Sequence, residues 1–504
     1  MRAGLIALDE RPVNTRYPSM IADIAGVDLV QPPPAILSSR RQPADCNQLL
    51  AWLEQAAAGL DTLIVSVEML GYGGLIASRT TDDATAEVIN RLDALRAVRQ
   101  RNPNITMLAF DLIMRISRAD DSFEEPLYWS QYGSRFYRYS QLIDQQLQGR
   151  EVANELAEID AQLPREYRHD FLSRRLRNHI INLCMLQMVA DGVTDLLVIS
   201  SDDTSEYGLG TREKRWISEW AERLLPDDPR LLMYPGADEV GSALLTRAIN
   251  RQQGQTPGFA LHYAIPGDEE VTAPFEDGPV RITLARQVRA VGGQITADSA
   301  EADFIVVVNT PSRYHPMLYA EYNAAEEAHR MPYLEPLVQQ IQAWVDSGRR
   351  VIVADVAYPN GADPVLVRLL LERVEIHRLA AYGAWNTAGN TIGVALSQGI
   401  ASALARTNEQ KLAQQRFLTH RFLEDWGYQF SVRSEVRKTY IERYGTSEIA
   451  PDHLPTVRAE IEAGLRQRLA QLPYLGDRWR IVPGSIRLPW DRFFEVDFDL
   501  EPLR

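Results

Sequence analysis

The feature that most constrains this chain is a repeated alternation of short apolar runs with stretches of helical periodicity. Ten runs of four or five mostly apolar residues are spaced along the chain up to residue 383. Short buried strands separated by helices are typical of βαβ units, whose strands are parallel. The sequence therefore predicts an α/β protein with a parallel βα architecture. The predicted strands are Leu5–Leu8, Val27–Val30, Leu63–Val67, Thr106–Phe110, Leu196–Ile199, Leu231–Tyr234, Ala260–Tyr263, Phe304–Val308, Val351–Ala354 and Ala380–Gly383.

The number of predicted strands bears on the architecture. Ten strands are too many for a plain barrel of roughly eight strands and 250 residues. Two open parallel sheets of about six and about four strands, each like a Rossmann or flavodoxin-type lobe, accommodate them. A (β/α)8-type barrel with accessory strands is the alternative.

A helical insertion at about 112–190 separates the fourth and fifth predicted strands, because apolar residues repeat there at helical spacing and no strand is evident. An insertion at the carboxyl end of a strand can cover a site, or it can be a packed helical pair without such a role. We expect an α/β lobe over 1–255, a second α/β lobe over 256–405 and a smaller α+β region over 406–504. The last region should end in an antiparallel pair of strands, starting near Trp479.

Composition excludes several classes of protein. Among 504 residues, 68 Asp and Glu against 53 Lys and Arg give a net charge of −15, which argues against a nucleic-acid partner. No apolar stretch approaches the roughly 18–20 residues of a membrane helix, and the N-terminus does not resemble a signal peptide. Two cysteines, Cys46 and Cys184, are too few for a disulfide framework, so we expect a cytoplasmic protein. The sequence does not determine the oligomeric state.

Candidate catalytic residues follow from where ligands bind in parallel α/β proteins, just beyond the carboxyl ends of the strands. Asp202 and Asp203 are adjacent carboxylates directly after the fifth strand, and Asp238 and Glu239 follow the sixth. Like charges this close have pKa values that move apart, so that one group can stay protonated as a general acid. We predict that catalytic groups come from these four residues.

Other polar and aromatic residues at strand ends are candidates for substrate binding. Trp385 and Asn386 combine an aromatic platform with an amide, as in a sugar subsite. Carboxylates, amides and guanidinium groups suit hydrogen bonds to hydroxyl groups. The predicted substrate-binding residues are Asp9, Arg11, Asn14, Tyr72, Arg79, Asp355, Asn360, Trp385 and Asn386.

We predict no cofactor and name no metal ligand. None of the eight histidines shows the His-x-x-x-His spacing of a zinc helix. A divalent metal held by carboxylate oxygens, from residues such as Asp202, Asp203, Asp238 or Asp355, stays open as an alternative.

Six separated motifs support a resemblance to a known family. They are Leu8–Asn14, Gly71–Arg79, Ser201–Asp203, Gly236–Glu239, Asp355–Gly361 and Trp385–Thr391. Together they resemble the bacterial family catalogued as domain of unknown function 4127. The resemblance implies a bacterial, soluble, single-chain protein of about this size whose strand-end motifs form one shared site, but it carries no reaction.

The residue types at the strand ends favour a carbohydrate-processing enzyme that binds a small carbohydrate, most specifically a glycoside hydrolase. In a two-carboxylate route, Asp203 is the acid/base and Asp238 or Glu239 is the second carboxylate. In a substrate-assisted route on N-acetylhexosaminides, Asp202 orients the 2-acetamido group while Asp203 protonates the leaving oxygen. The alternatives are a divalent-metal-dependent sugar isomerase or hydrolase, and a non-enzymatic sugar-binding protein with its ligand in a cleft between lobes.

Overall fold

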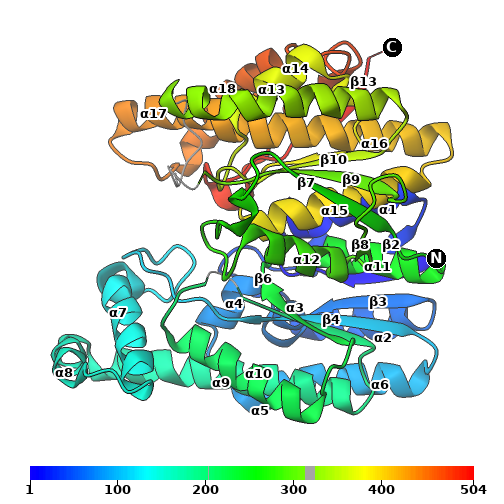
Figure 1. The fold of residues 1–504 in the computed structure, drawn as a ribbon. Helices are drawn as coiled ribbons and strands as arrows, with labels where there is room; N and C mark the ends of the chain where they lie inside the picture. Colours follow the sequence, from blue (N-terminus) through cyan, green and yellow to red (C-terminus); the bar gives the residue numbers. More distant parts are fainter. Residues whose placement is uncertain (202–203, 313–323, 504) are drawn as a thin grey trace. The chain divides into compact units, whose positions relative to one another are not determined.

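Two parallel sheets organise the chain, which forms two compact units (Figure 1). The structure, a computed structural model, describes residues 1–201, 204–312 and 324–503. The first unit comprises Met1–Glu10 and Asp28–Leu244, and the second comprises Arg11–Val27 and Leu245–Arg504. A short N-terminal segment, Arg11–Val27, therefore belongs to the second unit. The sequence instead predicts that the whole N-terminal region belongs to a first lobe over 1–255.

The sheet of the first unit has six parallel strands in the order β2-β1-β3-β4-β5-β6. The first five follow the flavodoxin-type order 2-1-3-4-5, and β6 extends the sheet beyond β5. Each matches a strand predicted from an apolar run. Their bounds are β1 (Arg2–Ile6), β2 (Asp28–Val30), β3 (Thr62–Ser66), β4 (Thr106–Ile113), β5 (Leu196–Ser201) and β6 (Leu231–Pro235).

The sheet of the second unit has five parallel strands in the order β11-β10-β9-β7-β8. Counted from β7, this is again the order 2-1-3-4-5, so both units share one topology. Both sheets are open, as in the two-lobe prediction, and the barrel alternative is not adopted. The bounds are β7 (Gly258–Tyr263), β8 (Gln294–Ile295), β9 (Phe304–Asn309), β10 (Val351–Asp355) and β11 (Ala381–Gly383); of these only β8 was not predicted.

Helices of the first unit cover its sheet and form the insertion after β4. The segment between β4 and β5 is helical, as predicted, but its helices have different roles. α9 is the crossover helix of an ordinary βαβ unit, because its residues Ile181, Met185 and Val189 pack into the core of the sheet. The helices are α2 (Cys46–Ala57), α3 (Val67–Tyr72), α4 (Leu75–Thr80), α5 (Thr85–Leu92), α6 (Ala94–Arg101), α7 (Trp129–Leu147), α8 (Ala153–Gln162), α9 (Arg165–Ala190) and α10 (Leu209–Leu224), with a 3-10 turn at Pro34–Ile36.

The part of the insertion ahead of α9 packs against the start of α9 in a small separate core. Trp129, Phe136 and Phe171 pack together, with ring centroids 5.0–5.8 Å apart. Figure 1 shows α7 and α8 standing to the side of the sheet. The true addition to the βαβ pattern is therefore the loop after β4 together with α7 and α8.

Helices of the second unit include α1, although it follows β1 in sequence. α1 packs against α15 and α16. The helices that lie in this unit are α1 (Pro12–Ala25), α12 (Val280–Ala290), α13 (Ala324–Asp346), α14 (Pro364–Arg373), α15 (Ala388–Leu404), α16 (Asn408–Arg421), the π-helix η4 (Phe422–Val432), α17 (Arg433–Tyr444) and α18 (Leu454–Leu469). α11 (Val240–Gln252) contains the division between the units, and 3-10 turns occur at Asp268–Glu270, Ile376–Arg378, Pro451–His453 and Pro489–Asp491.

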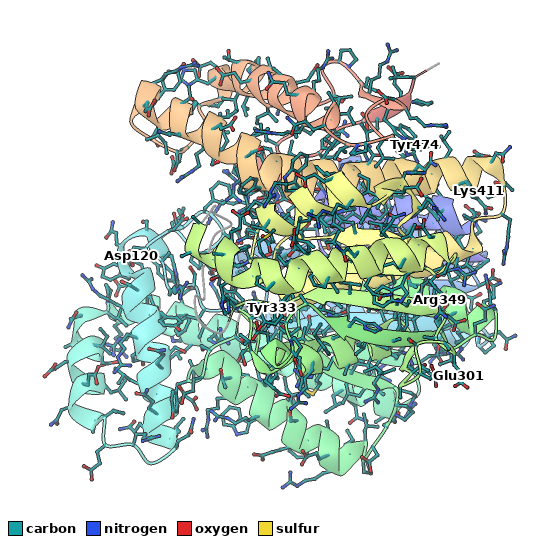
Figure 2. All side chains as sticks on the ribbon, turned by 45° about the horizontal axis from the view of Figure 1, so that its top comes forward. Asp120, Glu301, Tyr333, Arg349, Lys411 and Tyr474 are labelled. Carbon is teal, nitrogen blue, oxygen red and sulfur yellow. The ribbon has the colours of Figure 1, made fainter. Side chains whose placement is uncertain are left out.

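The predicted regions 256–405 and 406–504 share one hydrophobic core. Val353 of β10 and Leu366 of α14 belong to the same buried cluster as Ile461 of α18 and Phe498 near the C-terminus. Tyr474, which is labelled in Figure 2, stacks on the ring of His377 with 3.8 Å between ring centroids. The C-terminal region thus packs as a layer of the second unit.

The chain ends in the antiparallel strand pair that the alternation predicted. β12 (Trp479–Ile481) pairs with β13 (Leu500–Pro502), and an isolated bridge joins Arg487 to Asp497. Among the helices of the described residues, none combines the length and the hydrophobicity of a membrane-spanning segment.

Candidate functional site

In the first unit, the strand order reverses between β1 and β3, and ligands of open α/β sheets bind beyond the carboxyl ends of strands at such a point. Asp9 lies there and is buried. The neighbouring Glu10 accepts hydrogen bonds from the Ser38 hydroxyl and, at 2.6 Å, from the backbone N–H of Arg40. Glu10 is thereby tied to the loop that precedes α2.

Glu68, which follows β3, and Asp111, which lies within β4, form a buried pair of carboxyl groups. The two side chains are hydrogen-bonded to each other. Glu68 also accepts from the backbone N–H of Leu112 (2.7 Å) and the hydroxyl of Ser66 (3.0 Å), and Asp111 accepts from the amide of Asn182 (2.8 Å). Burial, and then the charge of Glu68, raises the pKa of Asp111 well above its usual value. A hydrogen bond between two carboxyl groups requires that one of them carries a proton, and the raised pKa of Asp111 makes it the donor.

Tyr72 and Arg79, two predicted substrate-binding residues, are both buried inside the first unit. The guanidinium carbon of Arg177 lies 4.8 Å from the centroid of the Tyr72 ring. Arg79 forms ion pairs with Glu124 (3.2 Å) and Glu125 (3.6 Å) in the loop after β4. These contacts connect the α3–α4 segment to the insertion.

The predicted catalytic residues Asp238 and Glu239 follow β6, as expected, and both are buried. The Glu239 carboxylate accepts a hydrogen bond of 3.0 Å from the backbone N–H of Ala237. Gly236 makes this turn with φ of +140°, and a Cβ atom there would clash with Oε1 of Glu239. The glycine is therefore required for the close approach of the carboxylate.

Asp202 and Asp203 lie outside the described residues. β5, which precedes them, ends at Ser201 as part of the parallel sheet. Their catalytic role remains a prediction from the sequence.

In the second unit, Asp355 at the end of β10 belongs to a buried hydrogen-bonded network. It accepts from the side-chain amide of Asn309 (2.8 Å) and from the backbone N–H of Asp363 (2.7 Å). Arg330 lies 3.3 Å from Asp363. Burial, and then the Asp363 charge, raises the pKa of Asp355 to about 7. These contacts make Asp355 a residue that positions the loop between β10 and α14.

That loop is joined to the loop after β11, where the predicted residues Trp385 and Asn386 lie. The backbone N–H of Asn360 donates to the carbonyl of Asn386 (3.0 Å), and both asparagines have positive φ, at +59° and +68°. Within the described part of the chain, neither Oδ1 of Asn360 nor the indole N–H of Trp385 has a hydrogen-bond partner. The two loops thus bring together an acceptor and a donor that a ligand could satisfy.

The π-helix η4 is attached to the same strand ends. The side-chain carboxylate of Asp425 accepts a hydrogen bond from the backbone N–H of Ala384 (2.7 Å). The backbone carbonyl of Asp425 accepts another from the N–H of Ala362 (3.0 Å). π-Helical turns are rare and occur frequently at functional sites. Here the wide turns bring acidic side chains to the ends of β10 and β11.

Glu424, one residue earlier in η4, is 2% exposed and lies among charged groups. It accepts a hydrogen bond from the Tyr17 hydroxyl and lies 3.0 Å from Arg421. Burial raises its pKa to about 8, with smaller contributions from the negative charges of Asp425 and Glu495, while Arg421 acts in the opposite direction. Glu424 is therefore largely protonated at neutral pH.

A buried histidine lies next to Glu424 and contacts an aspartate on its other side. Nδ1 of His420 lies 3.8 Å from Glu424, and its Nε2 lies 3.3 Å from Asp497. Burial lowers the pKa of His420 to about 4, so its ring is neutral near pH 7. Arg16 and Arg487 form ion pairs with Asp497. His420 therefore lies between Glu424 and the ion-paired Asp497.

Next to this acid lies an aromatic–arginine cluster, formed by Arg11, Trp385, Arg433, Trp490, Arg492 and Phe494. The guanidinium carbons of Arg11 and Arg492 lie 4.6 and 4.5 Å from the Trp490 ring centroid. Phe494 lies 6.0 Å from Trp385 between ring centroids. Glu495 lies 3.7 Å from Arg11 and 3.4 Å from Arg492. The predicted residues Arg11 and Trp385 thus meet a C-terminal segment that the sequence did not assign to a site.

The remaining predicted residue of this unit, Asn14, lies in the first turn of α1 and is buried. Its backbone N–H donates to the carbonyl of Arg11 (2.9 Å). The predicted residues are therefore divided between the units. Asp9, Tyr72, Arg79, Asp238 and Glu239 lie in the first unit, and Arg11, Asn14, Asp355, Asn360, Trp385 and Asn386 lie in the second.

A comparison with protein families gives one result. The family described as "Protein of unknown function (DUF4127)" matches residues 4–499. The chain belongs to this family. No curated protein and no solved structure matches it. The DUF4127 match includes the C-terminal segment, so the aromatic–arginine cluster lies within the family's span.

Metal binding was left open by the sequence. Over residues 1–201, 204–312 and 324–503, no group of three or more His, Cys, Asp or Glu side chains is arranged to hold a metal ion.

Several residues of the second-unit site were not predicted from the sequence, chiefly Glu424, Asp425 and Glu495. A signal for the first two exists, since Arg421, Glu424 and Asp425 interrupt an apolar helical stretch at spacings of three and four. Charged residues at that spacing on an otherwise apolar face indicate a buried ion-paired group.

Proposed function

We propose that this chain is a carbohydrate-processing enzyme, specifically a glycoside hydrolase. The observation that carries the proposal is a buried carboxyl group with a raised pKa, Glu424, that interacts electrostatically with a second carboxylate, Glu495, which lies beside two arginines of the aromatic–arginine cluster. Glycosidases use two carboxyl groups in different protonation states, one as an acid and one as a base or nucleophile.

The loops at the strand ends support a sugar as the ligand. A sugar hydroxyl can donate one hydrogen bond and accept another. Oδ1 of Asn360 and the indole N–H of Trp385, which are unpartnered within the described residues, offer the matching acceptor and donor. The aromatic side chain of Trp385 lies at the same loops and adds apolar surface for a sugar ring.

In this proposal, Glu424 donates its proton to the leaving oxygen as the glycosidic C–O bond breaks. Glu495 is the second carboxylate, which takes a proton from the attacking water or bonds to the anomeric carbon. Tyr17 and Arg421 hold Glu424 in position. In the substrate-assisted route predicted from the sequence, Asp202 orients the 2-acetamido group of an N-acetylhexosaminide and Asp203 protonates the leaving oxygen.

The test is a screen of aryl glycosides, including N-acetylhexosaminides, with the purified chain and its Glu424→Gln, Glu495→Gln, Asp202→Asn and Asp203→Asn variants. We expect Glu424→Gln to lower kcat by about 10²–10⁴-fold. Because a general acid must be protonated, wild-type activity should fall as pH rises through about 8, and this limb should disappear in the variant. Glu501→Gln, at an exposed carboxylate paired with Arg480, is the matched control.

The outcomes separate the candidate functions. Loss of activity only in the Asp202 and Asp203 variants would assign the chemistry to the pair predicted from the sequence. A sugar that raises Tm without turnover would indicate the non-enzymatic sugar-binding alternative. A folded protein that neither binds nor cleaves any of these compounds excludes carbohydrate processing.

A further inference from the structure

The aromatic–arginine cluster is richer in cationic groups than recognition of a neutral sugar requires. Arg11 and Arg492 both lie over the Trp490 ring, and Arg492 and Arg433 lie 4.8 and 5.4 Å from the centroid of Phe494. A single guanidinium group can donate to the hydroxyl groups of a neutral sugar, but a neutral sugar has no charge for several of them to balance. Three guanidinium groups stacked on two rings suit a different ligand.

The geometry of a stacked arginine favours an anion. A guanidinium group that lies over an aromatic face directs its N–H donors outward around the edge of the stack. In that plane it can give two parallel hydrogen bonds to a carboxylate or phosphate. Glu495, which lies within 4 Å of Arg11 and Arg492, already occupies the position of such an anion beside both groups.

The start of helix α1 adds positive electrostatic potential at the same place. Arg11 is the residue directly before α1, and Pro12 opens a helix of 14 residues. The N-terminus of a helix carries a partial positive charge that favours anions. Burial strengthens the effect, since Arg11 is 4% exposed and water screens charges less there.

Two unusual backbone conformations present the Trp490 ring. Trp490 and the following Asp491 have φ of +55° and +53°. Side-chain-bearing residues rarely adopt this conformation, and such strain is concentrated at ligand-binding and active sites. The strained turn places Trp490 against both arginines.

We propose that the sugar bound by this chain carries an anionic group, a carboxylate as in a uronic acid or a phosphate ester, which Arg11 and Arg492 bind. The proposal rests on the proposed carbohydrate function and names its substrate class. The sugar ring lies beside the cluster, and its anionic group joins Glu495 at the edge of the arginine stack.

The experiment measures binding of glucose, glucuronate and glucose 6-phosphate to the full chain by calorimetry and thermal shift, at low and high NaCl concentration. We expect at least one anionic sugar to bind ten-fold or more tightly than glucose, with a preference that shrinks as salt rises. The carboxylate and phosphate arms identify which group the site takes.

Variants test whether the cluster is responsible. Arg492→Met and Arg11→Met should remove the preference for the anionic sugar, and Arg492→Lys should restore only part of it because lysine lacks the planar fork. Arg480→Met, at an exposed arginine of the same C-terminal segment, is the matched control and should keep the preference.

The unfavourable outcomes are distinguishable. Equal binding of glucose and both anionic sugars overturns the inference and leaves the carbohydrate function standing. A salt-sensitive preference that survives both methionine variants also overturns it. If no sugar binds and no glycoside is cleaved, the carbohydrate function and this inference both fail.

Discussion

The carboxylate of Glu276 accepts a hydrogen bond of 2.7 Å from the backbone N–H of Gly389, in the first turn of α15. The hydroxyl of Thr283 donates to the same side chain at 3.1 Å. Burial nevertheless raises the pKa of Glu276 to about 7. This contact joins the segment before α12 to the helix that follows the Trp385 loop, so its protonation state affects the support of the site.

Glu276 should make the stability of the chain depend on pH. Its pKa is higher in the folded protein than the roughly 4.3 of an unfolded chain, so the folded state binds the proton more tightly. Its contribution to the free energy of unfolding is therefore greatest below about pH 4 and is lost as pH rises to about 7. Glu276→Gln keeps an acceptor for Gly389 and should flatten this dependence in urea unfolding between pH 5 and 8. Glu270→Gln, at an exposed glutamate, should retain the wild-type slope, and an unchanged slope in Glu276→Gln would contradict the assignment.

The Glu68–Asp111 pair predicts a difference between two substitutions of one residue. Asp111→Asn keeps a donor for Glu68 and an acceptor for Asn182, so it should change the free energy of unfolding by less than about 1 kcal/mol. Asp111→Ala removes both bonds inside the core and should cost about 2–3 kcal/mol. Urea unfolding at pH 7 measures both. Equal losses would show that the pair does not share a proton through Asp111.

Gly236 predicts a steric effect on a candidate catalytic residue. Gly236→Ala introduces a Cβ against the Glu239 carboxylate at a φ of +140°, and should lower stability by about 2–4 kcal/mol. Gly149→Ala is the matched control, because that glycine also has positive φ, at +83°, but nothing lies within 4 Å of the added atom. Its cost should stay near 1 kcal/mol. Tm values that fall equally in both variants would argue against a close contact at Glu239.

Metal removal distinguishes the proposed mechanism from the metal-dependent alternative. Since carboxyl groups alone carry the proposed acid–base chemistry, a chelator should leave both the glycosidase rate and Tm unchanged. A metal that binds only the folded state would raise Tm, and its removal would lower it. Elemental analysis of the purified protein, together with a chelator-induced drop in Tm, would favour the metal-dependent enzyme.

The strands could be predicted because a buried parallel strand is a local apolar run. All ten predicted runs are strands, and β8 escaped because Gln294–Ile295 is a two-residue, exposed edge strand. The membership of α1 could not be predicted in the same way. The spacing of its apolar residues predicts a buried face. Which unit that face packs against is decided by contacts with α15 and α16, nearly 400 residues away.

The candidate site shows the same division. Arg11 and Trp385 were predicted because polar and aromatic residues at strand ends are conspicuous. Glu495 was not, since in an alternating strand the polar side chains are expected to face solvent, whereas Glu495 is 3% exposed and lies beside Arg11 and Arg492. Glu424 was missed because a charged residue in a helix is expected at the surface.

By itself, the sequence determined the strand positions, the parallel α/β class and the family, because each depends on local periodicity or on motifs read in order. Only the tertiary structure decided which charged groups are buried and what they pair with. Burying a charge is favourable only where a partner waits, and the partners of Glu424 and Glu495 come from segments far apart in the chain, such as Tyr17 and Arg11. No local sequence pattern predicts a contact between residues so far apart, so the chemistry of the site can be seen only in the folded chain.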